Sequence, residues 1–567
     1  MVGEGPKVRD HPPTILDALA ARSSSDRLAY VFLAEGSSES EIRWTFADVA
    51  ARSAAFAAYL TGRGIRAGSR VVLAVNPSLD FVAALLGIMR LGAVPVPSFP
   101  PLRSKELDRF QAITVDCAAE GILIDAMYRP TMEALQERLR VAGLDPALCH
   151  PEDLATQPGA DTVASTHGDL ALIQYTSGST GSPKGVCLTH DNLVSNCEAL
   201  LRSMGPNPDR VIMSWLPPYH DMGLMGTILL TFYYGWPLVL MSPMHFIQDP
   251  RLWLKAISDY RVTSAVGPNF SLDMCVDAMN AGEAEGLDLS TVRELYCGAE
   301  PISVDTMARF EEASAAHGFD ASALLPCYGM AESTLFLSGK RKGTRWRTEC
   351  DPQDGRVLVS CGDVDSEHTV RIVDPVSGLP LPDGATGEIW VSGRSVAAGY
   401  YNREALTREV FHAQLPGDER SYLRTGDLGF FHGGELFITG RIKDLIIVNA
   451  RNIHPQDVEA AVGRAAPTVG RSVAFSVPGE GSERLVVLAE AGPHEDSADH
   501  FATIVEAIRT GVTAEFGVGP DIHLCAKRTI PTTTSGKVRR QEARRMFQSG
   551  KVTVLHADRR AVQECAG

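Results

Sequence analysis

The chain is predicted to be an α/β protein with a large N-terminal domain and a small C-terminal domain. Up to about residue 340, apolar runs alternate with amphipathic helical segments, and short β patterns separated by Gly, Pro and Asp follow. Such alternation is typical of mostly parallel sheets with crossover helices. A chain of 567 residues is too long for one hydrophobic core, so several subdomains are expected.

The two alternating blocks, at about residues 1–170 and 171–340, predict two packed sheet-and-helix subdomains. The elements expected in the first block are a strand at Val71–Val75, a helix at Leu79–Leu91 capped by Ser78, a strand at Ala93–Pro97, a helix at Ser104–Ala119 and a strand at Gly121–Ile124. In the second block, strands are expected at Val211–Trp215, Leu238–Met241, Val262–Val266 and Glu294–Cys297, and helices at Asp191–Met204, Pro250–Tyr260 and Val304–His317.

The composition of the chain changes near Gly339, where a polar stretch rich in basic residues begins. The short β patterns beyond it are Val357–Ser360, Thr369–Val373, Glu388–Ser392 and Glu435–Thr439, which predict a small β-barrel or distorted sheet at about 341–440. A last, mobile α+β domain is expected at 441–567. Its elements are a helix at Pro455–Gly463, strands at Ser472–Val477 and Arg484–Ala489, and a helix near Phe501–Phe516.

Charge and composition exclude several classes of partner. A formal charge of −16 argues against nucleic acid and anionic membranes. Eleven cysteines without a C-x-x-C pair, and an N-terminus without an apolar signal region, favour the cytoplasm. The stretch Met222–Gln248 lacks charged residues and is long enough to span a membrane, but Gly235, Pro237 and Pro243 interrupt it. We expect a buried helix and strand there and no transmembrane segment.

The stretch with the clearest chemistry is QYTSGSTGSPKGV, at Gln174–Val186. A buried strand is expected before it, at Leu170–Ile173, and a helix is expected after it, from Leu188 onward. Glycines permit close backbone approach, hydroxyls and amides donate hydrogen bonds, and the lysine supplies a charge, which together suit a polyphosphate. It is not a Walker loop, because Pro183 precedes Lys184 and Gly185 follows it. The alternative is a flexible polar loop. The residues expected to hold phosphate are Thr176, Ser177, Gly178, Ser179, Thr180, Gly181 and Lys184.

Six further strings follow this loop. They are WLPPYHDMGL (Trp215–Leu224), CGAEPI (Cys297–Ile302), PCYGMAEST (Pro326–Thr334), YLRTGDL (Tyr422–Leu428), GRIKDLIIVNARNIHPQDVE (Gly440–Glu459) and TSGKV (Thr534–Val538). In order and spacing the set resembles the adenylate-forming superfamily of acyl-CoA synthetases, luciferases and nonribosomal adenylation domains. HDMGL, YGMAEST and VSCG (Val359–Gly362) look most like the fatty acyl-AMP ligases. The segment Gly339–Leu358 falls where those ligases carry an insertion that ordinary acyl-CoA synthetases lack.

The resemblance implies ATP and Mg²⁺ as cofactors and assigns roles to particular residues. Glu332 would bind Mg²⁺, although by itself it could be a solvated acid or an ion-pair partner. Asp427 would accept hydrogen bonds from the ribose hydroxyls, a role compatible with an Asx turn at Gly426–Asp427, and Arg441 would reach ribose or phosphate. Tyr328 would stack on adenine, although core packing is its ordinary alternative. The other residues implied to lie at the nucleotide are Gly298, Ala299, Glu300, Gly329 and Met330.

The reacting centre needs no general base, because a carboxylate is already a nucleophile at neutral pH. It needs in-line positioning and compensation of negative charge. Lys184 and Lys537 would supply that charge, with Lys537 resembling the mobile lysine of the family and otherwise belonging to a solvated basic helix. His220 would lie beside the acyl carboxylate or else be a core histidine. Lys443 occupies the family's hinge position.

Two departures from the general family pattern bear on the acceptor. Ala331 stands where a threonine usually precedes the metal glutamate, and Asn449–Ala450 replaces a Gly-Gly pair found beside the pantetheine path. Both weaken an acyl-CoA synthetase assignment and leave adenylation untouched.

The expected activity is that of an AMP-forming fatty acyl-AMP ligase. A fatty acid and ATP would give acyl-adenylate and pyrophosphate, and the acyl group would pass to the phosphopantetheine of an acyl carrier protein or of a carrier domain in a polyketide or nonribosomal synthase. The alternatives are a fatty acyl-CoA synthetase, an amino-acid adenylation domain, and a nucleotide-binding regulatory protein that has lost the chemistry. The last is disfavoured because every expected charged residue is present.

Overall fold

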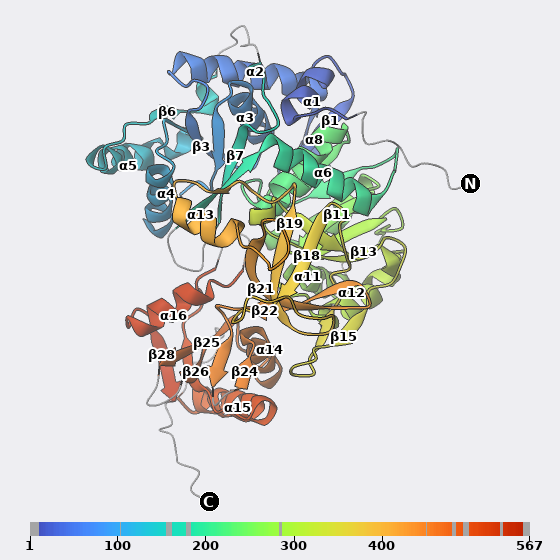
Figure 1. Ribbon diagram of the computed structural model, residues 1–567, viewed down its shortest axis with the longest axis vertical. Coiled ribbons are helices and arrows are strands. Elements are labelled where there is room, and N and C mark those ends of the chain that lie inside the picture. The colour runs from blue at the N-terminus through green and yellow to red at the C-terminus, as the bar shows by residue number, and fades with distance from the viewer. Residues whose placement is uncertain are drawn as a thin grey trace, which may run out of the picture. The chain divides into compact units, whose positions relative to one another are not determined.

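The computed structural model describes residues 11–101, 104–154, 162–176, 183–282, 286–448, 451–478, 483–491, 498–532 and 537–558. The chain divides into two compact units (Figure 1). The large unit comprises Met1–Thr176, Ser182–Thr425 and Gly429–Thr439, and the small unit comprises Ser177–Gly181, Gly426–Leu428 and Gly440–Gly567.

A four-stranded parallel sheet, in the order β4-β3-β5-β6, confirms the expected first block. Its strands are β3 (Arg70–Ala74), β4 (Val94–Pro97), β5 (Gly121–Ile124) and β6 (Ala147–Cys149). The helices of this part of the chain are α1 (Ile15–Arg22), α2 (Phe46–Gly62), α3 (Leu79–Arg90), α4 (Ser104–Asp116) and α5 (Arg129–Val141). Ser78 caps α3 as predicted, accepting a hydrogen bond from the amide of Phe81, and the apolar length of that helix is buried.

A nine-stranded sheet, in the order β17-β14-β13-β12-β11-β9-β10-β1-β2, forms the centre of the large unit. Its strands are β1 (Leu28–Leu33), β2 (Glu41–Thr45), β9 (Ile212–Ser214), β10 (Leu238–Met241), β11 (Ser264–Pro268), β12 (Glu294–Gly298), β13 (Leu324–Gly329), β14 (Phe336–Gly339) and β17 (Asp363–Val364). The six strands from β13 to β1 pair in parallel, and antiparallel pairs close both edges.

The sequence suggested one sheet for each of the two blocks of the chain, but the sheets are not divided in this way. Strands β1 and β2 come from the first block but pair into the sheet of the second. From Ala29 onward β1 is buried throughout, as suits a strand covered on both faces. The subdomain boundaries at about residues 170 and 340 stay predictions.

A three-stranded sheet, β20-β8-β7, carries the two ends of the glycine-rich stretch. Its strands are β7 (Leu170–Thr176), β8 (Lys184–Thr189) and β20 (Gly399–Tyr400). The sequence predicted a helix from Leu188 onward, and this is wrong: β8 intervenes, and α6 (His190–Met204) begins after a capping box formed by Thr189 and Asn192. Alternation in β8, which buries Val186 and Leu188, explains the strand.

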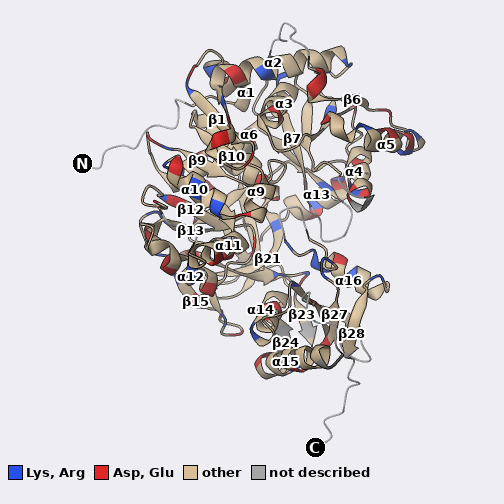
Figure 2. Ribbon diagram, turned by 180° about the vertical axis from the view of Figure 1, so that it is seen from behind, with Lys and Arg blue, Asp and Glu red and all other residues tan. Residues whose placement is uncertain are grey.

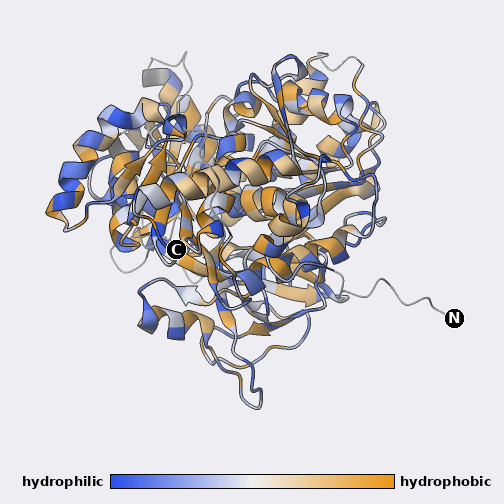
Figure 3. Ribbon diagram, turned by 90° about the horizontal axis from the view of Figure 1, so that it is seen from above, coloured by the Kyte–Doolittle hydropathy of each residue, from blue (hydrophilic) through white to orange (hydrophobic). Residues whose placement is uncertain are grey.

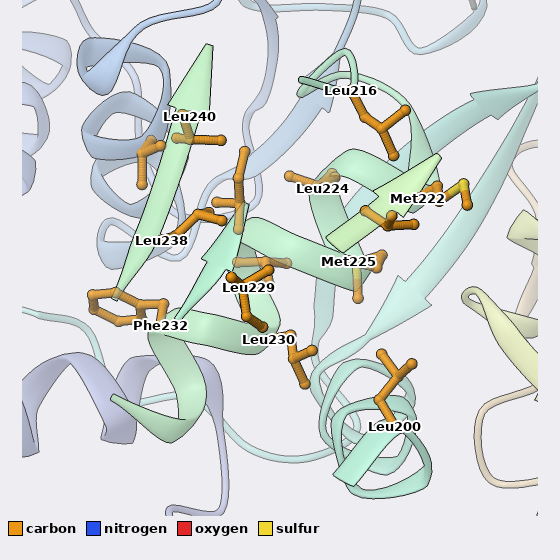
Figure 4. Close-up of a cluster of buried hydrophobic side chains, with 14 of the residues drawn as sticks. Leu200, Leu216, Met222, Leu224, Met225, Leu229, Leu230, Phe232, Leu238 and Leu240 are labelled. Carbon is orange, nitrogen blue, oxygen red and sulfur yellow. The ribbon is translucent and has the colours of Figure 1, made fainter. Parts of the chain in front are cut away.

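The uncharged stretch Met222–Gln248 contains a buried helical run and a buried strand, as expected, and ends in a helix that exposes Met244 and Ile247. It contains the end of α7 (Asp221–Gly223), the π-helix η5 (Leu224–Leu229), α8 (Leu230–Tyr234), β10 and α9 (Pro243–Gln248). Figure 4 shows apolar side chains of η5, α8 and β10 gathered with Leu200 of α6. Within the described residues, no helix has the length and apolarity needed to cross a bilayer.

The remaining helices of the large unit are α10 (Arg251–Asp259), α11 (Asn269–Asn280), α12 (Val304–Ala315) and α13 (Glu404–Phe411), with single 3₁₀ turns at η2 (Ser38–Ser40), η3 (Ala126–Tyr128), η4 (Pro151–Asp153), η6 (Ala321–Ala323) and η7 (Ala331–Ser333). Surface helices such as α5 carry charges of both signs (Figure 2). The strands are largely hydrophobic, whereas the surface helices carry hydrophilic residues (Figure 3). The core of the unit is therefore built on its sheets.

The β-rich segment near residues 341–440 forms an open sheet. Among the described residues its order is β18-β19-β21-β22, with β18 (His368–Val373), β19 (Gly387–Gly393), β21 (Leu423–His432) and β22 (Glu435–Arg441). Of the two expected forms, this is the distorted sheet and not a closed barrel. The polar stretch before it contains a hairpin of β15 (Thr348–Cys350) and β16 (Val357–Val359).

The small unit has an α+β fold with a core of its own, as the sequence predicted. A sheet in the order β25-β26-β27-β28 packs with helices around buried residues that include Val458, Val487 and Ile508. The elements are β23 (Ile446–Val448), β24 (Arg451–Ile453), α14 (Pro455–Ala465), β25 (Ser472–Pro478), β26 (Glu483–Glu490), α15 (Ala498–Phe516), β27 (Asp521–Cys525), α16 (Arg540–Gln548) and β28 (Val554–Asp558).

Candidate active site

The candidate site of the large unit lies at the carboxyl ends of neighbouring parallel strands. In the paired registers Pro268 of β11 lies beside Gly298 of β12, and Cys297 lies beside Pro326 of β13. The segments Gly298–Glu300 and Tyr328–Met330 therefore leave the sheet at the same edge. Open α/β sheets bind ligands outside this edge.

The Gly298–Glu300 segment turns sharply as it leaves β12. Ala299 has φ of 68°, a conformation that residues with a Cβ rarely adopt. A Cβ on Gly298 would lie 2.8 Å from Sγ and 2.9 Å from the carbonyl oxygen of Cys327, so only glycine fits there. Burial raises the pKa of the Cys327 thiol to about 12, so this sulfur stays protonated at neutral pH.

Glu300, expected at the nucleotide, forms a hydrogen bond within the protein that the sequence did not predict. Its Oε1 accepts a hydrogen bond of 2.8 Å from the amide of Phe270, in the first turn of α11. A carboxylate at a helix N-terminus satisfies a free amide and complements the helix dipole. Glu300 thus fixes the start of α11 against the end of β12.

Tyr328 and Gly329 end β13 under tight steric limits. Tyr328 is half-buried and pairs with Ser338 of β14, with its hydroxyl 4.0 Å from Sδ of Met330. A Cβ on Gly329 would lie 1.7 Å from the carbonyl oxygen of Leu335, which excludes every other residue. The backbone that carries Tyr328 and Met330 is therefore held in one path.

Glu332 and Lys184, distant in the chain, meet at one tyrosine. Glu332 is half-buried in η7, and the hydroxyl of Tyr400 donates a hydrogen bond of 2.9 Å to its Oε1. The Nζ of Lys184 lies over the ring of Tyr400, 5.1 Å from the centroid. Sequence reasoning missed Tyr400, because one tyrosine in an apolar GYY run carries no chemical signal of its own.

The glycine-rich stretch is described only at its two ends. Thr176 ends β7 opposite Lys184 at the start of β8, and its carbonyl oxygen accepts a hydrogen bond of 3.5 Å from Arg109. The predicted phosphate-binding residues Ser177, Gly178, Ser179, Thr180 and Gly181 lie outside the described residues.

His220 belongs to a polar pair and not to the hydrophobic core. Its Nδ1 lies 2.6 Å from Oδ1 of Asp221, and the two side chains are 27% and 16% exposed. The amide of Gln174, on β7, donates 2.8 Å to the carbonyl oxygen of Tyr219 and so ties this loop to the glycine-rich stretch. Burial raises the pKa of Tyr219, which stays neutral. The π-helix η5 begins within a few residues, and such helices are frequent at functional sites.

Within the small unit, Asp427 and Arg441 form an ion pair. Arg441 Nε donates 2.8 Å to Oδ1 of Asp427, with the aspartate side chain 6% and the arginine 58% exposed. Asp427 lies in β21, where Gly426 takes φ of 71°, so the strand continues where an Asx turn was the alternative. The buried carboxylate is thus oriented by a cation.

Lys443 and Lys537 also lie in the small unit. The carbonyl oxygen of Lys443 accepts 3.0 Å from Gln541 of α16, whose amide also donates to Asp444. Lys537 follows the predicted turn, of which residues 533–536 lie outside the described residues, and Thr532 bridges to Val538 across it. Lys443 is therefore joined to the helix that follows Lys537.

The donor set of the large unit fits the magnesium site that the sequence predicts. The described residues contain no group of three or more His, Cys, Asp or Glu side chains able to hold a metal ion. Mg²⁺ bound with nucleotides typically takes one or two carboxylates, and phosphate oxygens and water complete its shell. A single half-buried carboxylate at Glu332, oriented by Tyr400, matches that donor set.

Comparison with known proteins gives the family. The AMP-binding enzyme family matches residues 17–401. The medium-chain-fatty-acid–[acyl-carrier-protein] ligase JamA of Moorena producens (strain JHB) is 36% identical over 574 residues and covers 95% of each chain. The putative fatty-acid–CoA ligase FadD21 of Mycobacterium tuberculosis (strain ATCC 25618 / H37Rv) is 34% identical over 528 residues, 86% of this chain and 89% of the relative.

A solved structure of a similar protein extends the comparison. The crystal structure of fatty acyl-adenylate ligase from L. pneumophila, in complex with acyl adenylate and pyrophosphate, has a TM-score of 0.72 and 33% identity, and covers 96% of this chain and 98% of its own. The chain therefore belongs to the AMP-binding enzyme family.

Proposed function

We propose that this enzyme activates a fatty acid with ATP, giving acyl-adenylate and pyrophosphate, and passes the acyl group to a phosphopantetheine thiol. The acceptor would be an acyl carrier protein or a carrier domain of a polyketide or nonribosomal synthase. The observation that carries the proposal is the meeting of Lys184 and Glu332 on Tyr400, in a chain similar over nearly its whole length to fatty-acid ligases.

The large unit would hold the nucleotide and neutralise charge. Lys184 and the hydroxyls of the glycine-rich stretch would bind the triphosphate, and Tyr328 would stack on adenine. Glu332 would hold Mg²⁺, which when bound compensates phosphate charge. His220, fixed by Asp221, would lie beside the acyl carboxylate, which attacks the α-phosphorus without a general base.

The small unit would supply the ribose contacts and a second cation. The Asp427 carboxylate would accept hydrogen bonds from the two ribose hydroxyls, and Arg441 would orient it through their ion pair. Lys537 would bridge the fatty-acid carboxylate and the α-phosphate. The unit from about residue 441 would turn about Lys443 between adenylation and acyl transfer.

Carrier transfer is favoured over transfer to CoA by two features of this chain. Ala331 removes a hydroxyl from the step next to Glu332, and Asn449–Ala450, outside the described residues, adds side chains where close passage needs bare backbone. Two side chains hold the polar segment Gly339–Leu358 against other parts of the large unit. Lys340 donates a hydrogen bond of 2.9 Å to the carbonyl oxygen of Ser322, and Trp346 donates one of 3.1 Å to Glu311. The alternative function is that of a fatty acyl-CoA synthetase, because the similar protein FadD21 is named a putative fatty-acid–CoA ligase.

A cytoplasmic location is part of the proposal. The ten cysteines in the described part of the chain are all free thiols, which fits a reducing compartment.

The proposal is tested by following AMP and pyrophosphate with ATP, Mg²⁺ and fatty acids of several chain lengths, with amino acids as the control substrates. Acid-dependent pyrophosphate release and an acyl-adenylate identified by mass spectrometry are expected. Release that depends on an amino acid, or no release with any fatty acid, would contradict the proposal.

A further inference from the structure

We propose that Tyr400 is a positioning residue that orients the Glu332 carboxylate toward a nucleotide-bound metal and holds Lys184 beside it. The inference rests on the proposed function, since it concerns how the same site prepares for Mg·ATP. Its first basis is contact: the hydroxyl donates 2.9 Å to Oε1 of Glu332, while the ring face lies 5.1 Å from Nζ of Lys184.

The two contacts act on different parts of the tyrosine. The hydroxyl fixes one oxygen of the carboxylate, which sets the rotation of the group and therefore the direction of its other oxygen. The ring face attracts the ammonium group electrostatically. Lys184, expected at phosphate, and Glu332, expected at the metal, are thus both positioned by the side chain of Tyr400. That side chain has only two rotatable bonds, so little entropy is lost in fixing it.

Tyr400 is itself held firmly. Its backbone amide donates 2.9 Å to Oγ1 of Thr407, and β20 pairs with β8 so that Tyr400 lies opposite Val186. Its ring packs edge-to-face on Phe411 at 5.0 Å, and the residue is only 8% exposed. A side chain so confined can transmit its position to Glu332.

The segment at residues 393–400 also fixes the backbone of η7 directly. The amide of Ala397 donates 2.9 Å to the carbonyl oxygen of Glu332, and Thr334 donates 2.6 Å to the carbonyl oxygen of Ser395. Thr334 has φ of 71°, a strained conformation that needs such support. His368, hydrogen-bonded to both Asp365 and Ser395, secures the segment from its other side.

The orienting partners of a metal ligand are known to matter nearly as much as the ligand. Removing one typically lowers metal affinity or activity by about 10-fold or more. Tyr400→Phe deletes only the hydroxyl and keeps the ring beneath Lys184 and against Phe411. Tyr401→Phe is the matched control, because Tyr401 is the adjacent tyrosine and its amide bonds to Gly185 without use of the phenol.

The test measures nucleotide binding and needs no fatty acid. Dissociation constants for α,β-methylene ATP are determined by calorimetry in EDTA and in Mn²⁺, and their ratio gives the metal-dependent part of affinity. The ratio is expected to fall about 10-fold in Tyr400→Phe and to stay at the wild-type value in Tyr401→Phe. Partial unfolding cancels, because both constants come from one protein sample.

A double-mutant cycle decides whether Tyr400 acts through Glu332. Glu332→Gln should lower the ratio, and adding Tyr400→Phe to it should lower it no further, since residues in one network are not additive. An unchanged ratio in Tyr400→Phe, losses that multiply in the double variant, or a wild-type ratio near one would overturn the inference. If the variants behave as expected but the wild-type enzyme turns over no fatty acid, the proposed substrate is contradicted and the role of Tyr400 stays supported.

Discussion

The fully buried Glu294 at the start of β12 allows a prediction with a magnitude. Its side chain and that of Arg210 are both 0% exposed and joined at 3.0 Å, and Arg210 also lies 4.8 Å from the ring centroid of Trp236. Lys342 of the polar segment Gly339–Leu358 pairs with the other carboxylate oxygen and is 37% exposed. Glu294 thus joins the segment to the strand that ends at Gly298.

Arg210→Met should lower the free energy of unfolding of the large unit by about 3 kcal/mol, because it removes the fully buried partner of Glu294 and leaves that buried carboxylate with only the partly hydrated Lys342 as a nearby cation. Lys342→Met should cost about 1 kcal/mol, since Arg210 stays in place and Lys342 is partly hydrated already. Adding Glu294→Gln to Arg210→Met should restore most of the loss, because the buried charge is then gone.

The assay is urea unfolding followed by tryptophan fluorescence. Arg347→Met is the control, since Arg347 and its partner Glu435 are 52% and 23% exposed and should contribute little. The reasoning is refuted if Arg210→Met costs no more than Arg347→Met. It is also refuted if Glu294→Gln adds to the loss in place of relieving it.

Three further predictions concern pH, catalysis and transfer. Burial lowers the pKa of His190 from 6.5 to about 4, so stability is complete above pH 6.5 and falls by about 3 kcal/mol as the pH drops to 4; His190→Gln should flatten that decline, measured by urea unfolding across the range. Lys537→Ala should slow acyl-adenylate formation about 100- to 1,000-fold in rapid-quench assays with little change in ATP affinity, because it removes one cation from the reacting centre. Lys443→Pro should leave adenylation intact and impair transfer to a carrier, measured as separate half-reactions, because proline fixes the torsion on which reorientation depends.

Each of these has a contradicting outcome. The same acid decline in His190→Gln would assign the loss to carboxylates. Pyrophosphate release near the wild-type rate in Lys537→Ala would remove that residue from the catalytic set, and equal losses in both half-reactions of Lys443→Pro would indicate a static unit or general misfolding. Lys551→Ala is a control for Lys537, because it removes a lysine of the same unit from an exposed position.

Local signals predicted the elements whose residues determine them locally. Ser78 followed by an apolar run marks the start of α3, and Gly121–Ile124 bounds β5, because caps and β-rich runs act within a few residues. The short β8 was missed because its alternation spans only six residues beside a strong helix signal. The placing of β1 next to β10 depends on pairing between segments distant in the chain, which one sequence does not encode locally.

The candidate site divides in the same way. The motifs selected Lys184 and Glu332 as candidates by their residue types, but not the tyrosine that contacts both, which lies 68 residues beyond Glu332 in the sequence. The hydrogen bond of Glu300 to the start of α11 was likewise hidden, because a carboxylate can serve a ligand or a helix and only the fold distinguishes them. The sequence shows which side chains can take part in the chemistry, whereas the residues that each of them contacts are determined by the tertiary fold.

The most direct test of the proposed activity offers two acceptors to one preformed intermediate. Enzyme loaded with radiolabelled acyl-adenylate is divided and mixed with a phosphopantetheinylated carrier protein or with CoA, and acyl-thioesters are counted over time. The account predicts rapid acyl-carrier formation and little or no acyl-CoA. Efficient acyl-CoA formation with an inert carrier would contradict it and make the enzyme a fatty acyl-CoA synthetase.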